Sequence, residues 1–193
     1  MKKFEEKKFN IPELKGISAK NIEEHLKLYA GYVKNLNLIQ EIIDDKNHPE
    51  YALSETQRRQ GFEFGGMRNH EYYFAHFEGG SKPLSPDSEL YTKISEWKES
   101  IESFIETFKN LASTRGVGWA ILGYDKKTDS LISYWVDEQH LGHLPEVSPL
   151  LCLDMWEHSF VADYNPSGKK QYIEDFFSNL NWDSVSKNFS DAR

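Results

Sequence analysis

Three residues in two widely separated segments could direct donor atoms to one metal ion. Asp154 and His158 lie four residues apart with Trp156 between them, and His70 follows Asn69 far upstream. In an extended or kinked segment, Asp154 and His158 can supply one oxygen and one nitrogen to the same ion, while Trp156 provides a water-poor wall. With His70 and one further upstream histidine, the set becomes three imidazoles and one carboxylate. Such a set suits a redox iron or manganese better than structural zinc, which prefers closed, cysteine-rich sites.

The first half of the chain, which must position His70, is predicted to be helical. Ser18 is the expected N-cap of a helix that begins at Ala19 and ends before Asn47, because its apolar residues recur close to a 3.6-residue period. A second helix is predicted from an N-cap at Ser54 to about Phe77. The adjacent glycines 65 and 66 inside it indicate either a close contact between helices or room for a ligand or a neighbouring side chain.

The second half mixes helices and strands. Helices are expected over 88–97, 100–111, 169–180 and 183–189, and strands over 117–124, 130–136 and 150–153, the last leading into Asp154. The segment 79–83, Gly-Gly-Ser-Lys-Pro, is the best linker. The predicted architecture is therefore an N-terminal α-helical hairpin over 1–83, followed by an α+β domain over 84–193 with a three-stranded antiparallel sheet.

Composition limits the classes of function. The 193 residues are 28% charged and 38% hydrophobic, as in globular proteins. The single cysteine, Cys152, excludes an internal disulfide and agrees with a reducing compartment, so a cytoplasmic location is expected. The charged N-terminal segment is unlike a secretory signal, and no apolar run reaches the length of a membrane helix, so no membrane partner is expected. The net charge of −8 argues against nucleic acid as a partner.

Six short motifs resemble those of the iron/manganese superoxide dismutases and follow the same order over nearly the whole chain. They are ISA at 17–19, YVKNLN at 32–37, GGMRNH at 65–70, GVGWA at 116–120, DMWEH at 154–158 and LNWD at 180–183. The resemblance implies that His70, Asp154 and His158 bind one iron or manganese ion per subunit, between the hairpin and the α+β domain. It implies dismutation of superoxide to oxygen and hydrogen peroxide as the activity, with a family member that has lost activity as the alternative.

The fourth ligand is less direct, because the first helix departs from the family pattern. Alignment backwards from Tyr32 places Glu24 at the ligand position, whereas alignment forwards from Ser18 places His25 there. His25 lies seven residues before Tyr32, nearly two α-helical turns, so both share one face of a regular helix. We therefore predict His25 as the ligand, with Glu24 as the alternative.

The resemblance also implies roles around the metal. A glutamine usually bonds to the solvent on the metal, either from the position that Gly66 occupies here or from the segment after the second strand. In that segment we assign the role to His140, with Gln139 as the alternative. Tyr32 matches the family tyrosine that orients the anion or passes protons. The remaining assignments are Trp119 and Trp156 as walls of the site, and Cys152 as a packing and tuning residue.

Subunit contacts and metal choice follow from the same resemblance. Glu157 matches the residue that bridges to His158 of the partner subunit, which implies a homodimer, with a tetramer as the alternative. Gly66 favours manganese. The sequence also agrees with iron, or with a protein that is active with either metal. Because an acidic protein that attracts an anion needs a local positive field, we expect a positive rim, for which the candidates are Arg68, Lys27, Lys169 and Lys170.

Overall fold

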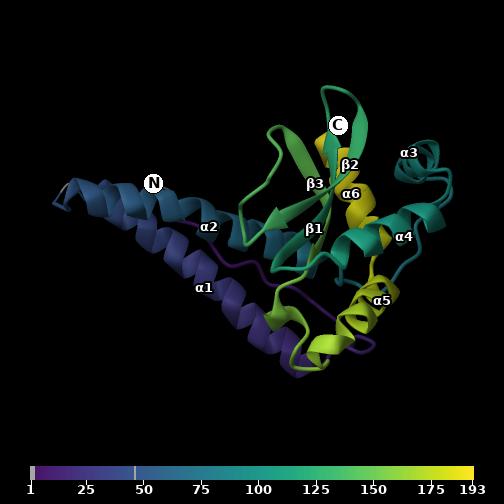
Figure 1. Ribbon diagram of the computed structural model, residues 1–193, viewed down its shortest axis with the longest axis horizontal. Coiled ribbons are helices and arrows are strands. Elements are labelled where there is room, and N and C mark those ends of the chain that lie inside the picture. Colours follow the sequence, from purple (N-terminus) through teal and green to yellow (C-terminus); the bar gives the residue numbers. More distant parts are fainter. Residues whose placement is uncertain (1–2, 46) are drawn as a thin grey trace.

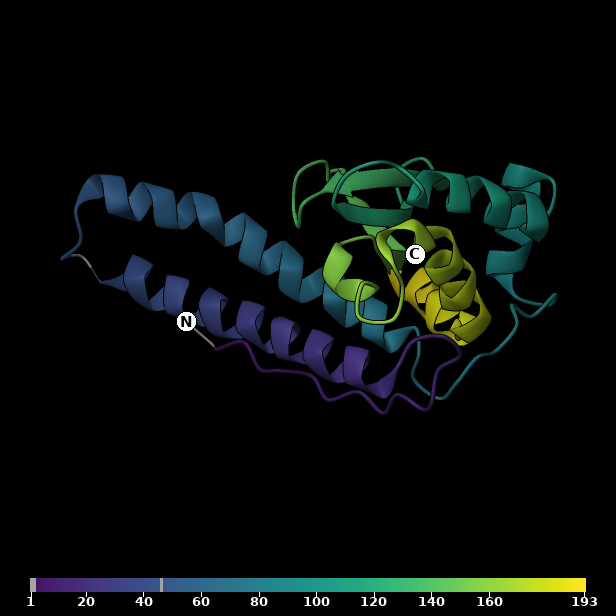
Figure 2. The same cartoon turned by 60° about the horizontal axis from the view of Figure 1, so that its bottom comes forward.

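Two long antiparallel helices extend away from the remainder of the molecule (Figures 1 and 2). The structure is a computed structural model that describes residues 3–45 and 47–193. Helix α1 spans Ala19–Asp44 and helix α2 spans Glu50–Ala75. The predicted helical hairpin is therefore confirmed. Within the described ranges, no helix combines the length and the apolar character needed to cross a membrane.

The two helix starts differ in how well the sequence predicted them. Ser18 caps α1 as expected, because its side chain accepts a hydrogen bond from the Asn21 backbone N–H. Helix α2 begins at Glu50, directly after Pro49, and the predicted N-cap at Ser54 is wrong. The Ser54 hydroxyl instead donates to the Tyr51 carbonyl inside the helix, which is the usual bond of a mid-helical serine.

The second half is an α+β unit, as predicted. After α3 (Glu89–Lys98) and α4 (Ile101–Ala112), the chain forms β1 (Gly118–Asp125), β2 (Ser130–Asp137) and β3 (Val147–Asp154). A 3₁₀ turn at Glu157–Ser159 (η1) and another at Pro166–Gly168 (η2) lead to α5 (Lys169–Asn179) and α6 (Trp182–Ala192). The sheet is antiparallel with the order β2-β1-β3, so β1 is central and its side chains are nearly all buried. The division of the chain at residue 83 stays a prediction.

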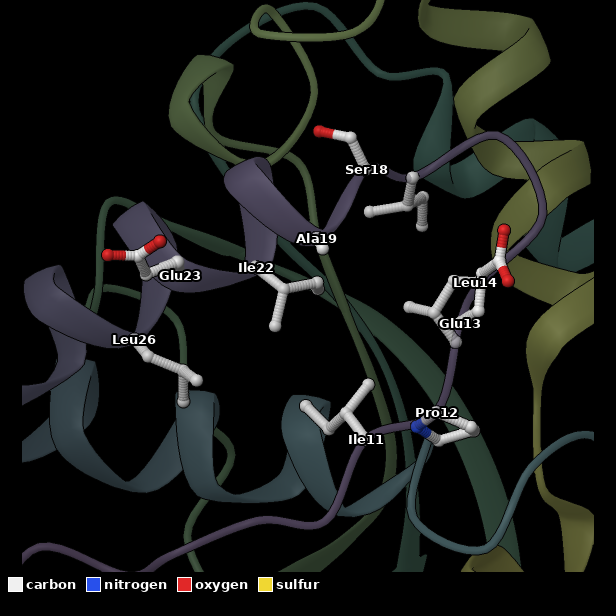
Figure 3. A pocket seen from close by; sticks show the side chains of 10 residues that line it. Ile11, Pro12, Glu13, Leu14, Ser18, Ala19, Ile22, Glu23 and Leu26 are labelled. Atoms are coloured by element: carbon white, nitrogen blue, oxygen red, sulfur yellow. The ribbon is translucent and has the colours of Figure 1, made fainter.

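An N-terminal arm, residues 3–17, runs beside α1 before the helix begins (Figure 2). Between this arm and the first turns of α1 lies an open cavity of about 710 Å³, lined by Ile11, Leu14, Ile22 and Leu26 among others (Figure 3). Glu13 and Glu23 stand at the same cavity. None of the four predicted metal ligands lines it, so this cavity is separate from the candidate metal site.

His76, at the C-terminal end of α2, connects three elements of the core. Its Nε2 accepts the Cys152 backbone N–H of β3 at 3.1 Å, and its Nδ1 lies 2.9 Å from the Ser184 hydroxyl of α6. Because Nε2 is an acceptor, the proton sits on Nδ1 and the ring is neutral. Burial of this ring lowers the pKa of His76 from 6.5 to about 3. The fold therefore holds His76 uncharged at pH values where the unfolded chain would bind a proton.

This buried histidine should make the protein lose stability as the pH falls. Above about pH 6.5, His76 is neutral in both the folded and the unfolded protein. Between about pH 6.5 and 3, it binds a proton only in the unfolded protein. One such group lowers the free energy of unfolding by about 1.4 kcal/mol per pH unit in that window. Urea unfolding of the metal-loaded protein at pH 7, 6 and 5 should therefore show a steeper loss for the wild type than for His76→Gln. Equal slopes for the two proteins would contradict this account.

Candidate metal centre

The four predicted ligands converge at one buried point, although they come from four separate elements. His25 lies on α1, His70 on α2, Asp154 at the end of β3 and His158 in η1. The Oδ2 atom of Asp154 is 3.1 Å from Nε2 of His25, 3.2 Å from Nε2 of His158 and 3.5 Å from Nε2 of His70. The donor atoms all lie within 4.8 Å of one another. Donor atoms of one first-row ion at about 2.1 Å stand about 3 Å apart, so this spacing fits a single shared ion.

His70 shows most directly that a cation belongs at this point. Its Nδ1 donates to the Gly66 carbonyl at 2.6 Å, which leaves a bare lone pair on Nε2. That Nε2 atom is buried, has no hydrogen-bond partner within the described ranges, and faces the Asp154 carboxylate oxygen at 3.5 Å. Two acceptors buried face to face repel each other. A metal ion that accepts both lone pairs removes this conflict, so the residues fit iron or manganese.

The protonation states at the site are those that metal binding requires. Burial alone would raise the pKa of the Asp154 carboxyl, but the His158 and His25 imidazoles together hold it below its ordinary value. Burial lowers the pKa of His25, and it lowers the pKa of His70 to about 3. The Asp154 carboxylate is therefore ionised and the His25 and His70 imidazoles are neutral, so little proton release from these three ligands opposes metal binding.

Backbone contacts fix the direction of the Asp154 side chain. The central strand places Trp119 opposite Asp154, and the next backbone N–H, of Met155, donates to the Gly118 carbonyl at 2.9 Å. The Asp154 carbonyl accepts from the Tyr172 hydroxyl of α5 at 2.9 Å and from the Ser159 hydroxyl at 3.1 Å. Sequence reasoning missed Tyr172 and Ser159, because nothing in their local sequence signals a contact with β3.

The side chains of His25 and Glu24, the two candidates for the first-helix ligand, point in different directions. Helix α1 is continuous through this region, and the His25 side chain is fully buried at the site. Glu24 faces solvent, with a side chain that is 61% exposed and 2.9 Å from the Lys27 ammonium. The geometry therefore favours His25 over Glu24, as helical periodicity predicted.

Gln139, the predicted alternative to His140, bridges two of the other predicted residues. Its side-chain oxygen accepts from the Trp119 indole N–H at 2.9 Å, and its amide nitrogen donates to the Tyr32 hydroxyl at 3.0 Å. Gln139 is fully buried. His140 instead packs edge-on against Phe62, with ring centroids 5.7 Å apart. These contacts favour Gln139, and not the preferred His140, for hydrogen bonding beside the metal.

Four aromatic rings contact one another beside the ligands, and we call Tyr32, Phe62, His140 and Trp156 the aromatic cluster. Tyr32 lies 5.1 Å from the His70 ring and Trp156 stacks on the His158 ring at 5.7 Å. Phe62 packs against the three other members of the cluster. Tyr32, His140 and Trp156 are partly exposed, so this side of the site is the one that approaches solvent.

Cys152 and Glu157 both lie next to ligands in the chain, and their roles stay predictions. Cys152 is fully buried two residues before Asp154, and burial raises the pKa of its thiol. Glu157 is exposed, directly before the partly exposed His158. An exposed carboxylate beside a ligand can reach a second subunit.

The glycine pair in α2 makes room for residues beside the ligands. A Cβ atom at Gly66 would lie 2.5 Å from the Tyr32 ring, and one at Gly65 would overlap the Gln139 carbonyl oxygen. The Gln139 carbonyl also accepts from the Asn69 side chain at 3.1 Å, which ties the residue before His70 to this loop. Gly66 fits both interpretations of the glycine pair, because the Tyr32 side chain that occupies its space comes from the neighbouring helix α1, whereas Gly65 makes room for the backbone of Gln139.

Replacing Gly65 by alanine should therefore move the Gln139 loop and lower both stability and activity. The added methyl group meets backbone that cannot rotate away, so we expect a loss of about 3 kcal/mol in unfolding free energy. Gly31→Ala is the matched control, because a Cβ at Gly31 meets nothing within 4 Å and alanine favours the helix by up to about 1 kcal/mol. Urea unfolding measures both variants. A Gly65→Ala protein as stable as Gly31→Ala would contradict the close contact.

Comparison with known proteins agrees with this site. The family model described as iron/manganese superoxide dismutases, C-terminal domain, matches residues 86–188. A superoxide dismutase [Fe] of Aquifex aeolicus is 32% identical over 188 residues, which cover 93% of this chain and 87% of that protein. A superoxide dismutase [Mn] of Mycolicibacterium smegmatis is 32% identical over 175 residues, covering 87% and 82%. Since the family model matches residues 86–188 and relatives that are 32% identical cover 87–93% of the chain, the protein belongs to the iron/manganese superoxide dismutase family.

Proposed function

We propose that this superoxide dismutase holds its single iron or manganese ion with His25, His70, Asp154 and His158. The observation that carries the assignment is the buried Nε2 lone pair of His70, which faces the Asp154 carboxylate without a partner among the described residues. When bound, the metal supplies reversible one-electron oxidation and reduction. Three neutral imidazoles and one carboxylate keep the charge of the site low in both oxidation states.

The residues beside the ligands position the substrate and hold protons. We assign Gln139 to the hydrogen bond that faces the metal, because one of its two amide N–H groups is used by Tyr32 and the other remains available. The Tyr32 hydroxyl accepts that bond and can itself donate a proton outward, toward the solvent-facing side of the site. Trp119 fixes the amide from behind at 2.9 Å. Trp156 stacks on His158 and excludes water from that ligand.

Metal loading separates an active enzyme from a family member that has lost activity. The purified protein is stripped of metal and reloaded with iron or with manganese in separate samples. Elemental analysis should give about one ion per subunit, and superoxide consumption should appear with at least one of the two metals. A protein that binds one ion per subunit but consumes no superoxide with either metal would contradict the proposed roles of the residues around the site.

We also propose that the protein is a homodimer in which Glu157 bonds to His158 of the partner subunit. Glu157 is exposed, and Leu28 and Val161, exposed at 43% and 44%, add apolar surface on α1 and just after η1. Native mass spectrometry should give twice the mass of the chain for the wild type and a monomer for Glu157→Arg. A wild-type monomer at micromolar concentration would contradict this assembly.

A cytoplasmic location is the last part of this proposal. The single cysteine is fully buried and reduced, which agrees with a compartment that keeps thiols reduced. Fractionation of the source cells, with an antibody against the protein, should recover it with cytosolic markers.

A further inference from the structure

The negative net charge of this protein repels its anionic substrate, so a positive side chain near the site would help superoxide to approach. The chain carries a net charge of −8, and superoxide is an anion. The four predicted rim residues lie elsewhere or have other partners. Arg68 bonds to Glu71 at 2.7 Å and lies over the Phe4 and Phe64 rings, not over the aromatic cluster. Lys27 lies 2.9 Å from both Glu23 and Glu24, and Lys169 donates to the Thr114 carbonyl at 2.7 Å. Lys170 lines a surface cavity on α5 together with Glu102, Glu106 and Glu174. A different cation is therefore the better candidate.

Arg59 of α2 lies directly against the aromatic cluster. Its guanidinium carbon stands 3.5 Å from the centroid of the Phe62 ring, and its side chain is 51% exposed. Phe62 in turn contacts Tyr32, with ring centroids 6.0 Å apart, and Tyr32 lies 5.1 Å from the His70 ring. The charge is thus placed on the side of the site that approaches solvent.

Glu63 holds this arginine in place. The Nε of Arg59 donates to a Glu63 carboxylate oxygen at 3.1 Å, and the other Glu63 oxygen accepts from Asn35 of α1 at 3.3 Å. The Glu63 side chain is only 6% exposed, whereas half of the Arg59 side chain faces water. The Arg59–Glu63 pair therefore points its negative end into the helix interface and its positive end outward. Within the described ranges, no hydrogen bond engages the two terminal nitrogens of Arg59.

The geometry points to Arg59 as the residue that guides superoxide to the metal site, with Glu63 as its buried anchor. Arg59 is a positioning residue, since it lies outside the ligand set and acts on the approach of the anion. The inference rests on the proposed function, because it assumes that the substrate enters past the aromatic cluster. Arg59 thus takes the role for which the sequence suggested Arg68, Lys27, Lys169 and Lys170, because it lies against the aromatic cluster.

Salt dependence of turnover tests this role, with the neighbouring arginine as a matched control. Arg59→Gln should lower kcat/KM about threefold at an ionic strength of about 0.01 M, where the Debye length is about 30 Å. The difference should vanish near 1 M, where the Debye length is about 3 Å, and kcat should not change at any salt concentration. Arg58→Gln removes an equal charge from a side chain that is 71% exposed and paired with Glu55, without a contact to the aromatic cluster, so kcat/KM should fall clearly less than in Arg59→Gln. Arg59→Lys should restore most of the lost rate.

A change in the anchor should act in the opposite direction, which loss of folding cannot imitate. Glu63→Gln removes the buried negative end of the Arg59–Glu63 pair and should raise kcat/KM about twofold at low salt. Binding of azide, a small anion, to the metal-loaded protein should follow the same order: tightest for Glu63→Gln, then wild type, then Arg59→Gln. Equal effects of Arg58→Gln and Arg59→Gln, or a loss that persists near 1 M salt, would overturn the inference. Absence of turnover in the wild type would contradict the proposed function instead, while azide binding would still test Arg59.

Discussion

His25→Ala should leave the protein folded but with less than about a tenth of its metal. The substitution removes one of the four donors and leaves the Asp154 oxygen, 3.1 Å from the lost nitrogen, with fewer partners. Loss of a partner outside the ligand set typically weakens metal binding by 10–100-fold, so loss of a ligand should exceed about 100-fold. Elemental analysis after dialysis against a weak chelator measures the effect, and circular dichroism checks that the helices persist.

Glu24→Ala is the matched control for this prediction, because the two residues are neighbours on the same helix. The Glu24 carboxylate is exposed and lies 2.9 Å from the exposed Lys27 ammonium. Exposed pairs of this kind contribute at most about 1 kcal/mol, so the metal content of Glu24→Ala should equal that of the wild type. If Glu24→Ala lost the metal and His25→Ala kept it, the assignment of the first-helix ligand would be reversed.

The family resemblance implied three of the four ligands, and the fourth, His25, could be predicted because spacing is informative in a regular helix. A continuous α1 turns His25 and Tyr32, seven residues apart, to the same side, and both reach the site in the structure. Asp154 could be placed because it ends a short apolar strand, which the sheet then pairs with β1. The starts and ends of elements were harder to predict. Helix α2 begins at Glu50 because Pro49 fixes the backbone at φ −58°, without any side-chain cap to signal the start.

The residues beside the ligands could not be predicted to the same degree, because they depend on a turn. Gln139 and His140 are adjacent, so a shift of one residue exchanges their places. The turn is set by Glu138, which adopts a φ of 51°, a conformation that is rare for a glutamate and that no sequence pattern signals. It is also set by Gly65, where the missing side chain lets the Gln139 carbonyl approach α2. Arg59 was missed for a related reason, since its position over Phe62 depends on a pair of buried and exposed charges.

Gln139→Ala should lower kcat by about 10–100-fold while the metal content stays near one ion per subunit. The amide joins the Trp119 indole and the Tyr32 hydroxyl, and no other described side chain donates to or accepts from both. Groups that hydrogen-bond beside a metal commonly change activity by this factor. The substitution also leaves the buried Trp119 N–H without its acceptor, so unfolding free energy should fall by about 1–3 kcal/mol. Stopped-flow superoxide decay, with metal content measured on the same sample, separates the two effects.

His140→Ala is the control that decides between the two neighbours. Its ring packs against Phe62 at 5.7 Å and its Nδ1 makes no hydrogen bond among the described residues, so its removal costs packing in the aromatic cluster. We expect kcat to fall by no more than about threefold, because the Gln139 bonds to Trp119 and Tyr32 stay in place. Gln139→Asn adds a second comparison, since the same amide on a shorter stem cannot reach both partners and should behave like Gln139→Ala. If kcat fell as much in His140→Ala as in Gln139→Ala, at equal metal content, the hydrogen bond beside the metal would be assigned to His140. The positions of the two side chains in the structure would then not predict which of them acts in turnover.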